Sequence, residues 1–494
     1  MSPRRSPART VLMIGSEALP FSKTGGLADV LGALPLALAR LGWDVTLALP
    51  RYRGIVDGGL LERFPITIGG FVRDVGIFQV DLAPGARALL IDCPELFDRD
   101  FLYGDDSGDY PDNPRRFAML VRGALECAAR RGVAPLVVHA HDWQAALAPV
   151  YLRTLYAAHP VLAGTPCILT IHNLAYQGLC EVDWLPRLDL GRDQLTPARL
   201  EYWGRISLLK GGINDAQLIT TVSPRYAAEI QTPEFGCGFD GILRARAGDL
   251  VGILNGIDTE KWDPEHDPFI PEPFGPERLE GKVASKSEVL ARFNLPAAVV
   301  ERPLVGMISR MVDQKGFDLV AALAADLPRL EASFVVLGTG ESRYQDLWTQ
   351  LAAAHPDRIG VHIGFNEPLA HLIEAGADIF LMPSQFEPCG LNQMYSLRYG
   401  TVPVVRAVGG LADTVTDYAP GRRTATGFVF EPYAPAALLG ALTRALTLYH
   451  DHTSWKALQQ RGMLQDHSWD RSAREYVKIY GRIGRIRQDI GLRA

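Results

Sequence analysis

The amino-acid sequence predicts an α/β protein built from two Rossmann-like domains, whose parallel sheets face each other across a deep cleft. Short apolar, β-branched runs alternate with helical patterns nearly throughout, which is typical of parallel sheets with helices on both faces. The 494 residues are too many for a single hydrophobic core. A proline-rich, charged segment without periodicity, residues 258–281, separates the two sets of runs. We therefore expect one sheet on each side of this segment.

The expected strands form two sets, each large enough for one sheet. In the first half of the chain they cover residues 10–17, 44–50, 135–142, 167–173 and 217–223. In the second half they cover residues 304–310, 332–340, 358–365, 377–384, 402–410 and 427–433. Helical patterns lie between them, for example at residues 27–42, 317–330 and 436–450. Ligands of such sheets bind beyond the carboxyl ends of the strands.

The domain boundary is expected inside the segment 258–281, because it contains five prolines and many charges. We place the hinge near residues 258–265. The sequence then predicts an N-terminal domain over residues 1–260 and a C-terminal domain over residues 261–470.

Composition excludes several classes of protein. The formal net charge of −6 argues against a nucleic-acid-binding surface. No run of about 18 apolar residues is present, so no membrane span is expected. The basic start, MSPRRSPART, lacks an apolar segment long enough for a secretory signal. None of the six cysteines forms a C-x-x-C pair, which favours a reducing cytoplasm over a disulfide framework or a zinc site.

The stretch FSKTGGLADVLG, residues 21–32, joins an expected strand to an expected helix. Its two glycines let the backbone approach a ligand, and a helix start offers unpaired N–H groups and a partial positive charge. An anion-binding junction and a tight turn with a surface lysine explain the stretch equally well. The pentapeptide GGLAD recurs at residues 409–413, beginning with Gly409 and Gly410. We interpret the two copies as similar turns that favour anions.

Polar side chains follow several expected strands, at the edge where α/β sites are built. Arg310 and Lys315 flank one strand-to-helix turn and are suited to a diphosphate, although such a pair also occurs as a surface salt bridge. Glu387 is suited to sugar hydroxyls, but it could equally cap the helix that follows. His172 is suited to acid–base or hydrogen-bonding roles, although a single histidine is more often structural.

Familiar motifs of other enzyme classes are absent from the sequence. It has no G-x-x-x-x-G-K-[ST], no G-x-S-x-G and no H-E-x-x-H, and no G-x-G-x-x-G follows the first expected strand. The residues alone therefore indicate a two-domain cleft enzyme suited to a phosphorylated ligand, without an obvious metal site.

An ordered set of motifs resembles one family. In chain order they are KTGGLADV (23–30), YPDN (110–113), HAHDWQ (139–144), TIHNLAYQG (170–178), TVSPRYAAEI (221–230), QTPEFGCGFDGIL (231–243), ILNGIDTEKWDP (253–264), SRMVDQKGFDL (309–319), EPCGLNQMYSLRYG (387–400) and GGLADTV (409–415). The set resembles bacterial glycogen synthases and plant starch synthases, the family 5 glycosyltransferases. No single motif is decisive, but the ordered set is highly specific.

The resemblance implies a GT-B fold and retaining transfer of glucose from ADP-glucose to the non-reducing end of an α-1,4-glucan such as glycogen. It implies no metal and no cofactor besides the donor, no nucleic-acid partner and no membrane. It also implies that residues 471–494 form a helix crossing back to the N-terminal domain. The preference for ADP over UDP rests on the resemblance alone, and the oligomeric state is not readable.

The resemblance also assigns roles to individual residues. The expected catalytic residues are His172, Arg310, Lys315 and Glu387. The expected donor-loop and substrate-binding residues are Lys23, Gly25, Gly26, Glu17, Asp29, Tyr110, Asp142, Asn255, Cys389, Gly390, Leu391, Gly409 and Gly410. Lys23, Gly25 and Gly26 are expected to form the donor loop. Arg310 and Lys315 of the catalytic set are expected to bind the diphosphate.

Two alternatives remain at this point. One is a glucan phosphorylase of the same fold, which would need pyridoxal phosphate. The other is a glucan-binding protein without activity, which is disfavoured because Arg310 and Lys315 are both present. Retention is compatible with a double displacement or with same-face attack, and the resemblance favours same-face attack.

Overall fold

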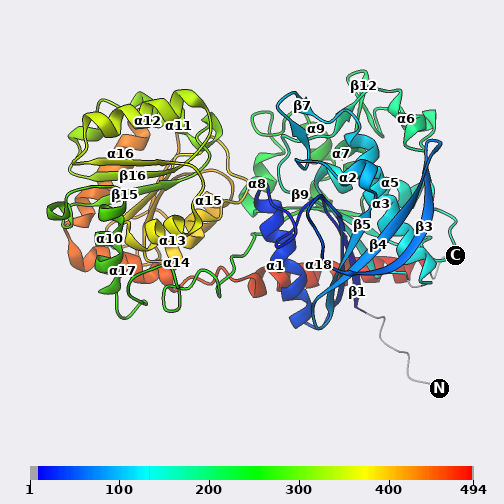
Figure 1. Cartoon of the computed structure of the whole chain (residues 1–494), viewed down its shortest axis with the longest axis horizontal. Helices are drawn as coiled ribbons and strands as arrows, with labels where there is room; N and C mark the ends of the chain where they lie inside the picture. Colours follow the sequence, from blue (N-terminus) through cyan, green and yellow to red (C-terminus); the bar gives the residue numbers. More distant parts are fainter. Residues whose placement is uncertain (1–8, 133, 492–494) are drawn as a thin grey trace. The chain divides into compact units, whose positions relative to one another are not determined.

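The computed structural model describes residues 9–132 and 134–491, which divide into two compact units (Figure 1). Within the described residues, the first unit runs to Val222, continues over Ala227–Ile253 and returns from Trp469 onward. The second unit consists of Ser223–Tyr226 and Leu254–Ser468. The chain thus enters the second unit a few residues before position 260, and its C-terminal helix belongs to the first unit.

The first unit contains a nine-stranded sheet in the order β14-β13-β9-β8-β1-β2-β5-β4-β3. The strands are β1 (Thr10–Ile14), β2 (Asp44–Pro50), β3 (Gly59–Ile68), β4 (Phe71–Ala83), β5 (Ala86–Asp92), β8 (Val137–His141), β9 (Cys167–Ile171), β13 (Leu218–Thr221) and β14 (Leu250–Gly252). Seven of them, from β14 to β5, pair in parallel. The strand order reverses between β1 and β8, which makes this the switch point of the sheet.

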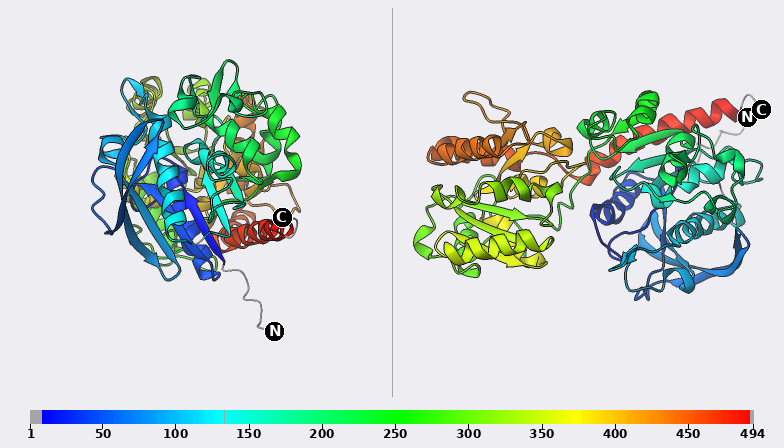
Figure 2. Two further views of the ribbon diagram at one scale, coloured as in Figure 1. Left: turned by 90° about the vertical axis from the view of Figure 1, so that its right-hand side faces the viewer. Right: turned by 90° about the horizontal axis from the view of Figure 1, so that it is seen from above.

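Strands β3 and β4 extend the first sheet with antiparallel pairings (Figure 2). These two strands lie outside the runs that the sequence predicts, and so do β5 and β14. In the second half of β3 buried and exposed residues alternate, as expected for a strand with one covered face. The first sheet is therefore mixed, with a parallel region that carries the strand ends of interest.

The second unit contains a six-stranded, fully parallel sheet in the order β17-β16-β15-β18-β19-β20. The strands are β15 (Leu304–Ile308), β16 (Ser333–Gly338), β17 (Ile359–Ile363), β18 (Ile379–Met382), β19 (Val402–Arg406) and β20 (Phe428–Phe430). This is the Rossmann order 3-2-1-4-5-6, with its switch point between β15 and β18. All six strands lie within the runs that the sequence predicts.

Helices connect and cover the strands. Those of the first unit are α1 (Gly26–Arg40), α2 (Pro94–Phe97), α3 (Asn113–Arg130), α4 (Asp142–Ala145), α5 (Leu147–Arg153), α6 (Trp184–Arg187), α7 (Leu208–Asp215), α9 (Asp240–Ala245) and α18 (Trp469–Gly491). Those of the second unit are α10 (Gly281–Arg292), α11 (Phe317–Ala322), α12 (Ser342–Ala354), α13 (Glu367–Gly376), α14 (Asn392–Arg398), α15 (Gly409–Thr414), α16 (Pro435–Tyr449) and α17 (His452–Met463), whereas α8 (Pro224–Glu229) begins in the second unit and ends in the first.

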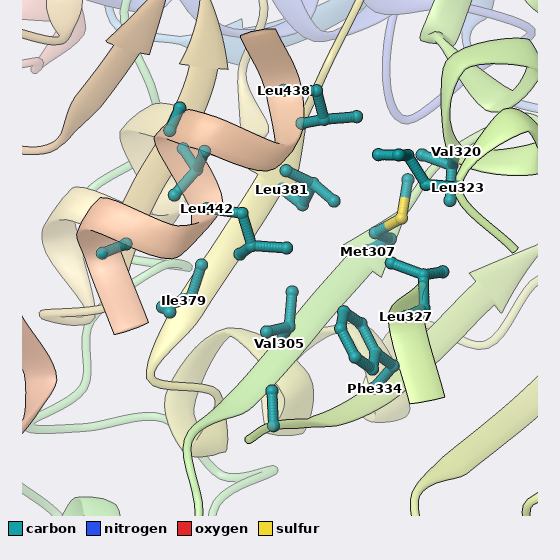
Figure 3. Packing of buried hydrophobic residues seen from close by; sticks show 14 of the residues in the cluster. Val305, Met307, Val320, Leu323, Leu327, Phe334, Ile379, Leu381, Leu438 and Leu442 are labelled. Atoms are coloured by element: carbon teal, nitrogen blue, oxygen red, sulfur yellow. The ribbon is translucent and has the colours of Figure 1, made fainter. Parts of the chain in front are cut away.

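The second sheet is buried on both faces, which explains why its strands read as continuous apolar runs. On one face, Val305, Met307 and Phe334 pack in a cluster with Leu438 and Leu442 of α16 (Figure 3). On the other face, the alternate strand residues Leu304, Val335 and Leu337 pack in a second cluster with Val289 of α10 and Ile373 of α13.

The C-terminal helix α18 packs on the first sheet beside α1 (Figure 1). Tyr476, Tyr480 and Ile483 are fully buried in the cluster that also contains residues of β1 and β2. Arg40 of α1 and Asp470 of α18 form an ion pair at 2.6 Å. Within residues 9–132 and 134–491, no helix is both long and apolar enough to cross a membrane.

Three glycines let backbone segments meet at the switch point of the second sheet. A Cβ on Gly409 would lie 1.9 Å from the carbonyl oxygen of Glu387, and one on Gly410 would lie 2.0 Å from that of Cys389. A Cβ on Gly316 would lie 2.2 Å from the carbonyl oxygen of Pro383. Gly409 also has a φ of +43°, a conformation that disfavours other residues. The loop after β18 is therefore fixed by contacts that no larger residue permits.

Gly409→Ala is expected to lower the stability of the second unit by roughly 2–5 kcal/mol, because the new methyl group meets backbone and the φ becomes strained. Gly440→Ala is the matched control: no atom lies within 4 Å of its Cβ position in α16, and it should gain roughly 0.5–1 kcal/mol. Thermal unfolding measured by calorimetry distinguishes the two. Equal melting temperatures for Gly409→Ala and the wild type would contradict this packing.

Candidate active site

The predicted site residues divide into two groups, one in each unit. The first strand-end site follows β1, β8 and β9 and contains Glu17, Lys23, Gly25, Gly26, Asp29, Asp142 and His172. The second strand-end site follows β15, β18 and β19 and contains Arg310, Lys315, Glu387, Cys389, Gly390, Leu391, Gly409 and Gly410. Asn255 also belongs to the second unit, and Tyr110 lies just before α3 in the first. Each group contains its sheet's switch point, where α/β proteins bind ligands.

Glu17 organises the loop between β1 and α1. Its Oε2 accepts hydrogen bonds from the backbone N–H of Thr24 at 2.6 Å and from the Thr24 hydroxyl at 2.8 Å. Burial raises the pKa of this carboxyl, although the bonds from Thr24 oppose the shift. Glu17 therefore acts first as an anchor for the loop that contains Lys23 and Gly25.

The start of α1 is open to a ligand. Gly25 precedes the helix in an extended conformation, and no side chain caps the helix. A Cβ on Gly26 would meet no atom within 4 Å. The nearby Lys23 forms an exposed ion pair with Asp29 at 2.7 Å. An exposed pair of this kind contributes little, about 0–1 kcal/mol, so an incoming anion can replace Asp29 as the partner of Lys23.

Three histidines stack at the carboxyl ends of β8 and β9. The rings of His139 and His141 lie 4.1 Å apart, and Nδ1 of His141 lies 3.0 Å from Nε2 of His172. His139 also lies 2.8 Å from the Tyr480 hydroxyl of α18 and 2.6 Å from the Thr170 hydroxyl. Burial lowers the pKa of His139 and of His172 to about 3 and that of His141 well below its usual value. The stack is therefore neutral at physiological pH.

Asp142 fixes the backbone at His172. Its Oδ1 accepts the N–H of His172 at 2.7 Å and lies 3.4 Å from the N–H of Asn173. Asp142 itself has a φ of +56°, a sparsely populated conformation that often occurs at functional sites. Burial raises the pKa of this carboxyl to about 7, despite the two N–H donors.

Tyr110 lies in a loop that also reaches the end of β1. Its ring is covered by the guanidinium of Arg99 at 4.6 Å, and Arg99 forms a bidentate pair with Asp112. In the same loop the hydroxyl of Tyr103 lies 2.8 Å from that of Ser16, next to Glu17. The ring of Tyr110 is thus held by neighbouring side chains.

Lys315 and Glu387 form the central ion pair of the second strand-end site. Nζ of Lys315 lies 2.6 Å from Oε2 of Glu387, and the Glu387 side chain is only 7% exposed. The Ser384 hydroxyl donates to the same oxygen at 3.0 Å. Arg310 is exposed and reaches only the Gln314 side-chain oxygen, at 3.4 Å. Within residues 9–132 and 134–491 no carboxylate pairs with Arg310.

Neighbouring groups fix the backbone of the segment after Glu387. Gly390 has a φ of +69°, and the side-chain nitrogen of Gln393 donates to the carbonyl oxygens of Cys389 and Gly390 at 3.0 and 3.1 Å. Burial raises the pKa of the Cys389 thiol to about 12, so it stays protonated. Oδ1 of Asn255 is buried without a hydrogen-bond partner in the described part of the chain.

The two GGLAD copies differ, contrary to the expectation of two similar anion-favouring turns. Gly25 and Gly26 are exposed, whereas Gly409 and Gly410 are buried against the carbonyls of Glu387 and Cys389. The N–H of Gly410 already lies within 3.2 Å of the carbonyl oxygens of Glu387 and Pro388. The second copy therefore supports the Glu387 loop and offers no open backbone to an anion.

Asp263, Glu265 and His266 form a cluster that could hold a metal ion, and it is the one such group among the described residues. It lies in the segment after β14, and two of the three side chains are exposed. None of the strand-end residues contributes to it. Exposed acidic groups of this kind are common without a metal, and nothing connects this cluster to the chemistry of either site.

Comparisons with known proteins match nearly the whole chain. Residues 10–245 match the family model described as starch synthase catalytic domain, and residues 293–460 match glycosyl transferases group 1. A glycogen synthase of Koribacter versatilis is 45% identical over 480 residues, covering 97% of this chain and 99% of its own. A glycogen synthase of Anaeromyxobacter dehalogenans is 47% identical over 471 residues, covering 95% of this chain and 98% of its own. The chain belongs to the glycogen synthase family.

Solved structures agree with this family. The catalytic domain of starch synthase IV from Arabidopsis thaliana, bound to ADP and acarbose, has a TM-score of 0.88 and 33% identity and covers 97% of this chain and 99% of its own. Sucrose-phosphate synthase from Thermosynechococcus elongatus has a TM-score of 0.62 at 17% identity and shows the fold alone. The enzyme is thus a glycosyltransferase with the GT-B fold, two Rossmann-like domains.

Several residues of the enzyme's two sites did not emerge from the sequence. His139 and His141 belong to the quoted motif HAHDWQ, but only the structure shows that they stack toward His172. Thr24 and Ser384 hold carboxylates and carry no sequence signal beyond their position next to Lys23 and Glu387. Their roles depend on distances across strands and loops, which spacing in the chain does not reveal.

The raised pKa of Asp142 predicts a specific dependence of stability on pH. The pKa rises from 3.8 to about 7 on folding, so the folded enzyme binds this proton more tightly than the unfolded chain. The contribution of this proton to the stability of the fold is complete below the pKa of Asp142 in the unfolded chain, and it is lost as the pH rises through about 7. Asp142→Asn, which cannot ionise, should gain stability relative to the wild type by about 1–4 kcal/mol between about pH 5 and about pH 8.5.

Thermal unfolding of both proteins across this pH range tests the expectation. Asp183→Asn is the matched control, because Asp183 is an exposed carboxylate paired with Arg187. A constant difference in melting temperature between Asp142→Asn and the wild type at every pH would contradict the raised pKa.

Proposed function

We propose that this enzyme elongates an α-1,4-glucan such as glycogen by transferring glucose from ADP-glucose to the non-reducing end, with retention of configuration. The observation that carries the proposal is the pair of cations after β15. Arg310 has no carboxylate partner in the described residues, and Lys315 follows it in the same loop after β15, at the switch point. The family relatives named glycogen synthase, and the starch synthase solved with ADP and acarbose, support the same donor and acceptor.

The second strand-end site is suited to the donor. Arg310 can bind a diphosphate with two parallel N–H groups, and Lys315 adds a point charge. Both hydrogen bonds of Glu387 fall on Oε2, so Oε1 remains available to the hydroxyls of the donor glucose. The diphosphate and the sugar would therefore bind to adjacent groups of one loop cluster.

The cations would act mainly in the transition state. Negative charge grows on the leaving ADP as the bond between glucose and phosphate breaks. Arg310 and Lys315 stabilise this charge more strongly than the charge of the bound donor, which is the requirement for catalysis. In this proposal the two cations supply the charge that a metal ion provides in other transferases, and the enzyme needs no metal or other cofactor.

The first strand-end site is suited to the acceptor hydroxyl and the sugar ring. Because burial keeps His172 neutral, it can exchange hydrogen bonds with sugar hydroxyls without adding a positive charge. Glu387 is paired with Lys315, which makes it a weak nucleophile. We therefore propose same-face attack, in which the leaving phosphate accepts the proton of the acceptor hydroxyl.

The compartment is part of this proposal. All six cysteines are free thiols, and five of them are buried. A reducing cytoplasm, where glycogen and ADP-glucose would both be present, suits such a chain.

Transfer of labelled glucose to glycogen tests the function. With ADP-glucose, in the presence of a chelator, the wild type should form α-1,4-linked product, whereas UDP-glucose should serve poorly. Lys315→Ala should lower the rate by about 10²–10³-fold, because a charged donor to the phosphates is lost.

Lys261→Ala is the control, since it removes a lysine that is also paired with a carboxylate but lies outside both strand-end sites. Its transfer rate should match the wild type. Transfer from neither nucleotide sugar by the wild type would contradict the proposed function. A rate for Lys315→Ala equal to that of Lys261→Ala would contradict the role of the cations.

A further inference from the structure

The hairpin β11–β12 presents a tryptophan at its tip. Strands β11 (Glu201–Tyr202) and β12 (Arg205–Ser207) pair with Tyr202 opposite Arg205, which leaves Trp203 and Gly204 as a two-residue loop. The side chain of Trp203 is 87% exposed, more than that of any other large apolar residue described in the structure. An exposed indole on a protruding turn is a candidate contact for a ligand.

The backbone at Trp203 makes this placement unfavourable for folding. Its φ is +51°, and that of Gly204 is +79°, the pattern of a type I′ turn. Such turns prefer Asn-Gly, because few residues other than glycine, asparagine and aspartate tolerate a positive φ. A tryptophan here buries nothing and strains the turn. Its presence therefore points to a task outside folding stability.

The base of the hairpin is rigid. The ring of Tyr202 packs edge-on against Phe239 at 4.9 Å, and its hydroxyl lies 3.4 Å from the carbonyl oxygen of Cys237. The ammonium group of Lys210 donates to the carbonyl oxygen of Glu201. These contacts fix the hairpin, so the indole is presented at low cost in conformational entropy.

The same small sheet carries further exposed polar and aromatic groups. Arg205, two residues after Trp203, forms an exposed ion pair with Glu181 at 3.0 Å. Strand β10 (Leu179–Cys180) pairs with β12, and the segment before it presents Tyr176, which is 58% exposed. An exposed ring and an exposed pair of planar charged groups on one small sheet match a pyranose, which has an apolar face of C–H groups and a rim of hydroxyls.

A short segment of the chain connects this small sheet to the first strand-end site. Residues 173–178 link His172 directly to β10, and Gly178 packs so closely on Trp143 that a Cβ would lie 2.6 Å from the indole ring. Gln177 also reaches the carbonyl oxygen of Cys237 at 2.8 Å, the atom that Tyr202 approaches. The hairpin, the 173–180 segment and the reacting histidine thus form one connected part of the first unit.

We propose that the β11–β12 hairpin is a binding subsite for the polymeric acceptor, in which the Trp203 indole stacks on a glucose unit of an α-1,4-glucan and the Arg205–Glu181 pair contacts its hydroxyls. The inference rests on the proposed function. The subsite holds a part of the polymer away from the reacting end. Long acceptors therefore gain from it, and short ones do not.

Affinity electrophoresis in glycogen-containing gels and transfer kinetics test the subsite. Trp203→Asn should bind glycogen about three- to tenfold more weakly, the range for loss of one aromatic contact. Its KM for glycogen should rise to a similar extent, whereas kcat, the KM for ADP-glucose and the KM for maltotriose should stay unchanged. Its melting temperature should equal or exceed that of the wild type, because asparagine suits a type I′ turn.

Two further variants make the test specific. Trp203→Tyr keeps an aromatic ring and should retain most of the glycogen affinity. Phe365→Asn removes an almost equally exposed ring, 86%, from the second unit and should change nothing.

Unchanged glycogen affinity in Trp203→Asn would overturn the subsite while leaving the proposed function intact. Equal losses in Trp203→Asn and Phe365→Asn would also overturn it, since any exposed ring would then suffice. An equal rise in the KM for maltotriose would assign Trp203 to the reacting end and overturn a separate subsite. If the wild type transfers no glucose, the proposed function fails, and gel retardation alone still decides whether the hairpin binds glucan.

Discussion

The direct contact between backbone segments at the second switch point is the constraint on which the second strand-end site depends. Gly409 and Gly410 lie against the carbonyls of Glu387 and Cys389, and Gly316 lies against that of Pro383, each too close to admit a Cβ. These contacts fix the loops after β15 and β18 relative to each other. Glu387 is consequently held at 2.6 Å from Lys315 although the two residues are 72 positions apart in the chain. Without this packing nothing would hold the loop of Lys315 at a fixed distance from the loop of Glu387.

The two strand-end sites differ in charge. In the second unit, Lys315 forms an ion pair with Glu387, and Arg310 remains free of a carboxylate in the described residues, which suits a phosphorylated ligand. In the first unit, burial keeps His139, His141 and His172 neutral. A neutral, hydrogen-bonding surface suits a sugar hydroxyl and a ring that becomes positively charged. The different charge of the two strand-end sites follows from local burial within each unit.

Much of the fold could be predicted from the sequence, because parallel strands buried on both faces produce continuous apolar runs. The six strands of the second sheet all lie within such runs. Strands β3, β4, β5 and β14 lie outside the predicted runs. β3 and β4 pair antiparallel and are in part exposed, Arg87 interrupts the apolar run of β5, and β14 has only three residues. Short, interrupted or partly exposed strands were therefore not predicted, whatever the direction of their pairing.

The candidate site was predictable in its residue types and less so in its contacts. Motifs identified Lys23, Lys315 and Glu387, yet the pairing of Lys23 with Asp29 and of Lys315 with Glu387 depends on loop geometry. The identical GGLAD copies show the limit most clearly: Gly25 begins an open helix start, whereas Gly409 supports a neighbouring loop. The same five residues serve two purposes because different backbone surrounds them.

Binding of ADP to Glu387→Gln, measured by calorimetry beside the wild type, tests the central claim most directly. If Lys315 serves the diphosphate and Glu387 competes for its charge in the free enzyme, removing the carboxylate charge should leave the ADP affinity unchanged or raise it by up to about tenfold, even though glucose transfer falls. A clear loss of ADP affinity in Glu387→Gln would show that the ion pair itself builds the nucleotide site, and would contradict the assignment of Lys315 to the diphosphate and Glu387 to the sugar.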